Sequence, residues 1–447
     1  MKENKLSMKI KLGYGVCDLG GNLFFTVIAF LFLNYLTDTV GINPGLAGMV
    51  IMIGKIWDAI TDPMVGYLSD KTKSRWGRRR PYIFFGSFPL FAGMALMFTN
   101  PNLSSQTQLF IWGVGVFCLL CTAYTLVNIP YNSLTPELTK DFHERSVLNG
   151  YRFGFAAVGT LLGAGAALPL VQAFPDRNLG FSMMGTIFGF IMLLTAFITV
   201  FVVKEPETER PEQLKGFFET YLKVFKNIPY VLILLTYTLH IAAITVVSGI
   251  IIYYFKYIHR DEAKTTLAMI ILLLTSMVFI PVSVKLAKKL GKKFVYGLGM
   301  AIFFVPMIII SLVGHLFAAE FTLIMMFPAG IGMGLTYPLP YAIVPDAVEY
   351  DYLLTGERTE GAFYGIWTFG IKIGQAVALG ITGLVLSITG YVPDVAQTAT
   401  SIIGIRLLVG PISALIFILA IVILYHYPIN ENRYNEIMAE IKLRDAK

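Results

Sequence analysis

The chain has 447 residues, of which 56% are apolar, 14% aromatic and only 14% charged. An average soluble domain is about 25% charged, and its core cannot enclose so many Phe, Leu, Ile and Val side chains. The mean hydropathy of +0.68 therefore excludes an ordinary soluble enzyme and predicts a polytopic membrane protein. The formal charge of +7 does not indicate nucleic-acid binding, because the Lys and Arg residues fall in short clusters between apolar runs.

Apolar runs long enough to cross a bilayer recur along the whole chain. We expect an all-α fold of twelve transmembrane helices with short connections and no sizeable soluble domain. The first run follows a lysine-rich start and is too long for a signal-peptide core, so we expect it to remain as a helix. The predicted spans cover 13–36, 43–67, 81–99, 108–130, 148–172, 180–203, 230–257, 265–286, 294–314, 321–343, 362–389 and 400–426.

The basic residues predict how these spans are oriented. Connections on one side hold most of the Lys and Arg residues, whereas the opposite side holds few. Cytoplasmic loops carry the positive excess, so we expect both termini in the cytoplasm and a multi-pass protein of the cytoplasmic (inner) membrane. We also expect a monomer whose other contacts are with membrane lipid. The basic residues of the opposite side are Arg177, Lys256, Arg260 and Lys264.

The longest polar connection between spans, 204–227, divides them six and six. We expect an N-terminal six-helix bundle over 1–203, a cytoplasmic central loop over 204–227, and a C-terminal bundle with a cytoplasmic tail over 228–447. A weak internal repeat supports this division, because the loop 66–80 after the second span is echoed by 285–293 after the eighth. Two six-helix halves with a substrate site near the midplane are typical of a carrier.

Two carboxylates lie one helical turn apart in the second predicted span. Asp58 and Asp62 would share one face, and a charge in hydrocarbon requires a cation, a partner or a wet cavity. Thr61 adds a hydroxyl and Pro63 frees a backbone carbonyl, and hard oxygen ligands of this kind suit Na⁺ or a shared proton. The alternative is that Asp62 pairs with Lys55 or with the loop arginines.

Further polar groups lie inside the first and fourth spans. Asp18 and Asn22 are one turn apart in the first, and the fourth carries hydroxyl and amide groups around Pro130 that suit sugar hydroxyls. Each of these groups has an equally good alternative role in hydrogen bonds between helices. The residues of the fourth span are Tyr124, Thr125, Asn128 and Asn132.

Two basic residues fall within later spans. Lys372 lies deep in the eleventh span, where it needs an anion or a wet cavity, and Trp367 and Thr368 precede it by one turn. Arg152 lies near the predicted start of the fifth span, where an interfacial anchor and a cavity-facing role are both open.

The basic run after the second span has two interpretations. It is typical of the positive charge that sets topology, but Asp70 with Arg78 and Arg79 would also form a cytoplasmic latch between the bundles that gates transport. No phosphate loop, catalytic set or metal-ligand spacing is present, so we expect neither an enzyme nor a cofactor. The cysteines lie inside apolar segments and are expected to be packing residues; they are Cys17, Cys118 and Cys121.

Three sequence motifs resemble a known family. The run 66–80 resembles the loop signature of the major facilitator superfamily. The run 57–63, Trp-Asp-Ala-Ile-Thr-Asp-Pro, is similar to the cation-site motif of the glycoside-pentoside-hexuronide:cation symporters, which the melibiose carrier typifies. The third match consists of Pro345-Asp346-Ala-Val-Glu349-Tyr350, Thr355-Gly356-Glu-Arg358-Thr-Glu360-Gly361 and Tyr364-Gly365.

This resemblance implies a fold, an activity and a set of site residues. It implies the major facilitator fold and a symporter that imports a sugar with Na⁺, or with H⁺, as coupling ion. Asp58 and Asp62 would bind the cation, with oxygens from Thr61 and Thr125. The chain departs from the melibiose carrier at Asn22, Asn128 and Asn132, so galactoside specificity is not carried over. The implied sugar-site positions are Asp18, Asn22, Tyr124, Asn128, Asn132, Arg152, Trp367, Thr368 and Lys372.

The substrate itself is left open by the sequence. The related lysophospholipid carriers share the run Asp-Ala-Ile-Thr-Asp-Pro, so lipid is the alternative, although the polar groups of spans 1 and 4 favour sugar. A sensor that binds without transport is a further alternative. The charges of Arg152 and Lys372, set against three carboxylates and one bound cation, make a neutral sugar the default. A hexuronide is the second choice if Asp18 pairs elsewhere.

Overall fold

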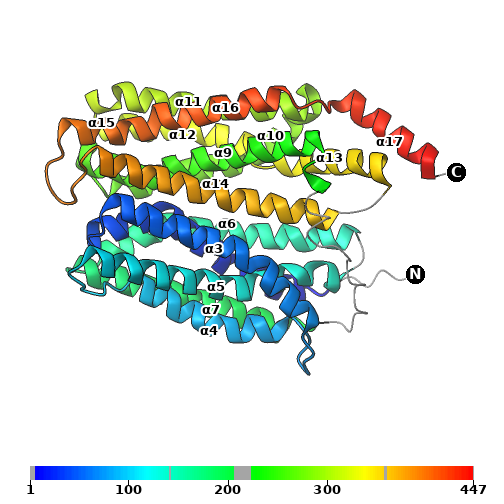
Figure 1. Cartoon of the computed structure of the whole chain (residues 1–447), viewed down its shortest axis with the longest axis horizontal. Helices are drawn as coiled ribbons and strands as arrows, with labels where there is room; N and C mark the ends of the chain where they lie inside the picture. Colours follow the sequence, from blue (N-terminus) through cyan, green and yellow to red (C-terminus); the bar gives the residue numbers. More distant parts are fainter. Residues whose placement is uncertain (1–5, 140–141, 206–222, 357–359, 446–447) are drawn as a thin grey trace. The chain divides into compact units, whose positions relative to one another are not determined.

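The computed structural model describes residues 6–139, 142–205, 223–356 and 360–445. These residues are mostly helical and none of them lies in a strand, which confirms the predicted all-α class (Figure 1). Most of the predicted central loop, 206–222, and the segment 357–359 that contains Arg358 lie outside the described residues. Contacts divide the chain into two units, Met1–Pro211 with Leu379–Gln397, and Glu212–Ala378 with Thr398–Lys447. The predicted division into halves places 379–397 differently and stays a prediction.

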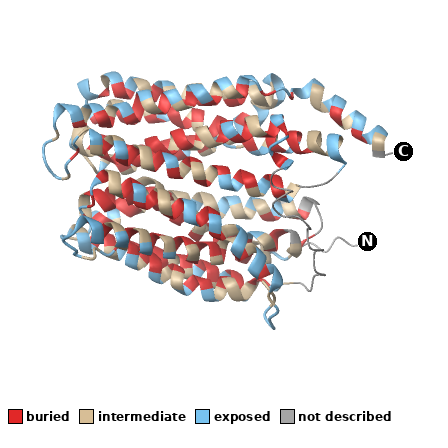
Figure 2. Ribbon diagram, viewed as in Figure 1, coloured by how far each residue is buried: buried red, intermediate tan, exposed pale blue. Residues whose placement is uncertain are grey.

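The first unit is a bundle in which α2 packs on α6 and α7, α3 packs on α5, and α4 packs on α5 and α7. Its apolar side chains are buried between these helices, while the outward faces stay exposed as lipid requires (Figure 2). The elements are α1 (Met8–Gly15), α2 (Cys17–Val27), the π-helical turns η1 (Ile28–Phe32) and η2 (Tyr35–Thr39), α3 (Pro44–Lys71), α4 (Arg80–Met97), α5 (Gln106–Leu138), α6 (Phe142–Gln172) and α7 (Arg177–Val202).

The second unit is built in the same way, with α12 packed on α10 and α11, and α16 packed on α9. A short helix, α17, follows the last span. The elements are α9 (Ile228–Tyr253), η3 (Tyr254–His259), α10 (Lys264–Leu290), α11 (Lys292–Val313), η4 (Gly314–Leu316), α12 (Ala319–Thr336), α13 (Leu339–Thr355), α14 (Glu360–Ile388), α15 (Ala399–Leu407), η5 (Leu408–Ile412), α16 (Ser413–Tyr425) and α17 (Glu431–Asp445).

Eleven segments of the described chain are long and apolar enough to cross a membrane. The third predicted span, 81–99, is also a helix, α4, but it is not among the eleven. It has only 18 residues and begins with Arg80, Pro81 and Tyr82, which lower the hydropathy of its first turn.

The tenth span extends well beyond its predicted end at residue 343. It consists of α12 and α13, which meet at Tyr337 and Pro338, and α13 continues to Thr355. The predicted end lies just before Pro345, and a proline inside a helix removes an N–H donor and crowds the preceding turn. The helix continues through this proline, and Lys292 Nζ of another helix donates a hydrogen bond at 2.8 Å to the carbonyl of Ala342 in the preceding turn.

Glycines allow α2 and α6 to approach closely. A Cβ atom on Gly159 would lie 2.2 Å from the carbonyl oxygen of Leu19, and one on Gly163 would lie 2.8 Å from Thr26 Cβ. Gly154 lies more than one turn earlier on α6, and a Cβ atom added there would have no atom within 4 Å. Only part of the glycine series on this helix therefore serves packing, as small residues do in membrane bundles.

We predict that Gly159→Ala destabilises the protein, because the methyl group must push α2 away from α6 at a cost of about 1–3 kcal/mol. Gly154→Ala is the matched control, and it should keep or slightly raise the melting temperature, since alanine favours helix where space is open. Thermal unfolding in detergent measures both. Equal shifts in the two variants would contradict the packing role.

Candidate cation and substrate sites

The two predicted cation carboxylates lie on α3 and face one hydroxyl of α5. Thr125 Oγ1 is 3.0 Å from Asp58 Oδ1 and 3.0 Å from Asp62 Oδ1. Asp58 and Thr125 are fully buried, with 1% and 0% of their surfaces exposed, and Asp62 is half-buried. Thr61, also buried, donates its hydroxyl to the carbonyl of Asp58 at 3.2 Å. The i, i+4 spacing read from the sequence thus brings both carboxylates to one point.

The chemistry of this arrangement is that expected of the predicted cation site. A hydroxyl carries a single hydrogen, so Thr125 cannot donate fully to both Asp58 and Asp62. Two carboxylates that share one hydroxyl repel one another, and a proton, a cationic side chain or a metal ion beside them lowers this repulsion. The Thr125 and Thr61 oxygens are hard ligands of the type that alkali cations accept. The four residues predicted for the cation therefore form one cluster in the first unit, while their role in cation binding stays a prediction.

A second polar cluster joins α2, α5 and α6. Arg152 Nε donates to Asp18 Oδ2 at 2.6 Å, and Arg152 Nη2 donates to Asn132 Oδ1 at 2.5 Å. The hydroxyl of Tyr131 donates to the same Asp18 Oδ2 at 3.0 Å. Arg152 lies in about the third turn of α6, which begins at Phe142, and its partners are inside the bundle. These contacts favour the inward-facing role of Arg152 over the interfacial anchor.

Sequence reasoning missed three residues that hold this ion pair. Thr135 accepts a hydrogen bond from Arg152 Nη1 at 3.0 Å and lies 2.6 Å from the Tyr14 hydroxyl. Tyr14 in turn donates to the carbonyl of Tyr131 at 2.9 Å. The signal was present in the spacing, because Tyr14 precedes Asp18 by one turn and Tyr131 precedes Thr135 by one turn.

The remaining predicted residues of the first unit lie next to these clusters. Asn132 Nδ2 donates to Asn128 Oδ1 at 2.7 Å, and Asn22 Nδ2 donates to the carbonyl of Asp18 at 2.9 Å. Tyr124 stacks on Phe24 with ring centroids 4.6 Å apart. A small cavity, with room for about one water molecule, lies beside Tyr124 and Asn128. Its walls include Cys17, Gly20, Gly21, Tyr124, Asn128 and Thr195.

Three predicted substrate residues belong to the second unit, on α14. Lys372 is buried, with 6% of its surface exposed, whereas Thr368 is exposed and donates to the carbonyl of Tyr364 at 3.0 Å. Trp367 is buried and stacks on Tyr237 at 4.5 Å between centroids. Its Nε1 is one of the buried donors of the described chain without a hydrogen-bond acceptor. The roles of these three residues in substrate binding stay predictions.

Comparison with known proteins identifies the family. A family model described as MFS/sugar transport protein matches residues 13–431. The chain belongs to this family. Its members are transporters, and the membership confirms the resemblance to glycoside-pentoside-hexuronide symporters that the sequence motifs indicated.

Individual relatives point the same way. The chain is 30% identical to a putative sulfoquinovose importer of Escherichia coli, over 99% of this chain and 95% of that protein. It is 26% identical to a glucuronide carrier protein homolog of the same species, over 98% and 96%, and 29% identical to an uncharacterized symporter of Bacillus subtilis, over 99% and 96%. The crystal structure of a mutant of the nucleoside transporter NupG has the same fold, with a TM-score of 0.69, 11% identity, and 93% of this chain and 99% of that chain covered.

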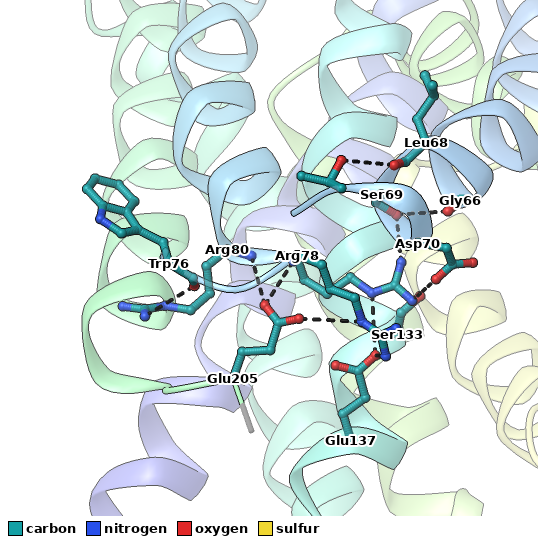
Figure 3. Close-up of polar contacts among 12 residues, drawn as sticks. Gly66, Leu68, Ser69, Asp70, Trp76, Arg78, Arg80, Ser133, Glu137 and Glu205 are labelled. Atoms are coloured by element: carbon teal, nitrogen blue, oxygen red, sulfur yellow. Dashed lines mark hydrogen bonds and ion pairs between the residues drawn. The ribbon is translucent and has the colours of Figure 1, made fainter. Parts of the chain in front are cut away.

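The loop signature of this MFS transporter forms a network of ion pairs (Figure 3). Arg79 pairs with Asp70 and donates to Ser69 Oγ at 2.6 Å, while Arg78 Nη2 donates to Glu137 Oε1 at 2.8 Å. The network ties the ends of α3 and α5 to the loop before α4. All these partners lie in the first unit, so the contacts brace that unit, and a latch between bundles stays a prediction.

Glu205, which follows α7, joins the same network. Its Oε2 accepts the backbone N–H of Arg79 at 2.8 Å, at the N-terminus of α4. Gly77 has φ +96°, and a Cβ atom there would lie 2.2 Å from Glu205 Oε2. In return, Arg80 Nε and Nη2 donate to the carbonyl of Val200 in the last turn of α7, at 2.9 and 2.6 Å. The two helices therefore cap one another reciprocally.

The second unit repeats this arrangement with lysines. Lys292 Nζ lies 2.7 Å from Asp346 Oδ2 on α13, and Lys293 Nζ donates to the carbonyls of Tyr425 and Tyr427 at 2.6 and 2.9 Å. One cation thus pairs with an acid and the next caps the end of the last span, as in the first unit. The weak sequence repeat between 66–80 and 285–293 corresponds to this shared geometry.

We predict that Asp70→Asn slows transport roughly two- to fivefold, because the substitution removes the partly exposed ion pair between Asp70 and Arg79. It should also speed labelling of a cysteine placed at the exposed Gly150 in a cysteine-free background. Lys73→Gln, an exposed charge in the same loop, is the control and should change neither rate. Uptake into vesicles and thiol labelling measure the two effects. Labelling that is the same in Asp70→Asn and the parent would refute a gating role.

Proposed function

We propose that the protein is a symporter of the cytoplasmic membrane, with both termini inside, that imports a sugar by alternating access coupled to Na⁺. The observation that carries this proposal is the convergence of Asp58 and Asp62 on the single hydroxyl of Thr125. Membership of the MFS/sugar transport family and relatives described as symporters support it. Na⁺ is favoured over H⁺ because two threonine oxygens can complete an oxygen shell around the carboxylates.

We predict that Asp58→Asn or Asp62→Asn abolishes cation-driven accumulation while downhill sugar exchange persists, because exchange needs no net movement of the cation. Thr125→Val should lower the apparent affinity for Na⁺ roughly tenfold by removing one ligand. Thr125→Ser keeps the hydroxyl and is the matched control.

Uptake by proteoliposomes under imposed ion gradients measures these effects. Accumulation that survives in both aspartate variants would overturn the proposed site. Accumulation driven by a pH gradient alone, without Na⁺, would replace Na⁺ by H⁺ as the coupling ion.

The positive charges of Lys55 and Lys372 favour an anionic sugar over the neutral sugar that the sequence predicts by default. Asp18 is neutralised by Arg152, so that pair contributes no net charge. Lys55, which was not included in the sequence-based count, is buried with 2% of its surface exposed, and its Nζ lies 4.9 Å from the centroid of the Phe25 ring.

Lys55 changes the balance of the predicted sites. Its charge adds to that of Lys372, while one bound monovalent cation offsets half of the charge of Asp58 and Asp62. Within this set of four residues and one ion there is one excess positive charge, which a carboxylate or sulfonate on the sugar would neutralise. Relatives described as a glucuronide carrier homolog and a sulfoquinovose importer support this choice.

We predict that methyl glucuronide competes with the transported substrate at least tenfold better than methyl glucoside, since one charge-assisted hydrogen bond contributes about 1.5–3 kcal/mol. Lys372→Gln should remove this preference and leave weak binding of both sugars. Counterflow in vesicles with unlabelled competitors measures the ratio. If the two sugars compete equally well, and Lys372→Gln does not change this, the substrate is a neutral sugar and not an anionic one.

A lysophospholipid is the second candidate substrate, and one observation favours it. An apolar groove runs along α6, and both Gly150 and Gly154 leave open space there. Lysophosphatidylcholine included as a competitor tests this candidate, and inhibition by it but by neither sugar would replace the sugar by lipid. The residues that line the groove are Val147, Gly150, Tyr151, Gly154, Phe155 and Val158.

A further inference from the structure

Helix α13 receives hydrogen bonds from side chains of several other elements. Lys292 Nζ of α11 donates to the carbonyl of Ala342 at 2.8 Å. Asn227 Nδ2, at the start of α9, donates to the carbonyl of Ala347 at 2.8 Å. Pro345 lies between these two carbonyls and removes a backbone donor, and a helix weakened in this way needs other partners inside a membrane protein. The position of α13 is therefore set by its neighbours.

The tail helix α17 is one of these neighbours. Tyr434, Ile437, Ile441 and Arg444 recur at helical spacing and form its inner face, with both isoleucines buried. The opposite face is in solvent, where Leu443 is 69% exposed. The helix packs on α13, so the tail is a docked element of the second unit.

Arg444 caps the last turn of α13. Its Nη1 donates to the carbonyl of Tyr352 at 2.6 Å and to that of Leu353 at 3.2 Å, and its guanidinium lies 4.2 Å from the centroid of the Tyr352 ring. Gly356, in the left-handed region at φ 72°, donates its N–H to the same Tyr352 carbonyl at 2.9 Å. A cation at a helix C-terminus also opposes the negative end of the helix dipole. Arg444 thus stabilises the point where the chain leaves α13.

The other end of α17 is also fixed to α13, through α11. Lys292 Nζ lies 5.6 Å from the centroid of the Tyr434 ring and pairs with Asp346 of α13. Burial, together with the charges of Asp346 and Glu349, raises the pKa of Tyr434, so its ring stays a neutral phenol beside the lysine. Two contacts about three turns apart therefore fasten the tail along the helix.

We propose that Arg444 is a positioning residue and that α17 is a strap that fixes the C-terminal end of α13. The next helix along the chain, α14, carries Trp367, Thr368 and Lys372. The effect on transport rests on the proposed function, because those three residues are its predicted substrate contacts. The effect on local structure does not depend on it.

Hydrogen exchange measured by mass spectrometry on the purified full chain tests the structural effect. Arg444→Ala should speed exchange of the amides in the last turn of α13 and the first turn of α14 about tenfold, because a hydrogen bond from a charged group is lost. Arg444→Lys keeps the charge and should retain part of the protection. Leu443→Ala is the control and should change nothing, and α3 should exchange equally in all variants. Unchanged exchange in Arg444→Ala would overturn the strap.

Counterflow of sugar tests the consequence for transport. Arg444→Ala should raise the half-saturating sugar concentration severalfold, and Arg444→Lys should restore part of the affinity, whereas the half-saturating Na⁺ concentration should be unchanged because Asp58 and Asp62 lie in the other unit. Faster exchange with an unchanged sugar affinity would overturn the positioning role. If the parent protein transports no sugar, the proposed function fails, and the exchange experiment still decides the strap.

Discussion

Hydrocarbon supplies no hydrogen bonds, and this constraint governs the polar residues of the structure. Every charge or free carbonyl within the spans must find its partner in the protein, and the cost of leaving one without a partner is several kcal/mol. Arg152 forms an ion pair with Asp18, and Lys292 donates a hydrogen bond to a carbonyl in the helical turn before Pro345. The cluster proposed to bind the cation differs, because Asp58 and Asp62 share the hydroxyl of Thr125. Under this proposal, a bound ion would relieve the crowding of negative charge.

In both units, basic side chains bind the carbonyl groups at the end of the last span, but the residues differ. An arginine or lysine at the start of a helix reaches the final carbonyls of the last span of its unit, as Arg80 does for Val200 and Lys293 does for Tyr425. The preceding cation pairs with an acid on the fourth span of the unit. Arginine forms a branched network in the first unit, while lysine acts as a single point of charge in the second. The shared geometry explains why only a faint repeat remains in the sequence.

Much of the fold and part of the candidate site were predictable from the sequence. Hydropathy located the helical spans, because a bilayer demands about 20 apolar residues for each crossing. The i, i+4 rule placed Asp58 and Asp62 on one face, since it depends only on helix geometry. These predictions use local information, which a single sequence contains.

What could not be predicted depended on which helices meet. Gly154 and Gly159 look alike in the sequence, and only the position of α2 distinguishes the open one from the packed one. Glu205 was read as part of a polar loop, although it caps α4, because its partners are backbone amides more than a hundred residues away. The length of α13 was also underestimated, since Lys292 and Arg444, both remote in sequence, supply donors to its carbonyls.

The carboxylate pair also has an electrical consequence for the proposed symporter. Moving one elementary charge across the membrane changes the free energy by about 2.3 kcal/mol per 100 mV. A monovalent ion between Asp58 and Asp62 changes the charge of the moving cluster by one, so the loaded and empty forms respond differently to voltage. That difference depends on the sugar. With a neutral sugar the added positive charge remains, so a potential that is negative inside would drive uptake even where the ion has equal concentrations on both sides. With the anionic sugar proposed above, the charge of the sugar cancels that of the ion, and the concentration gradients alone would drive the fully loaded step.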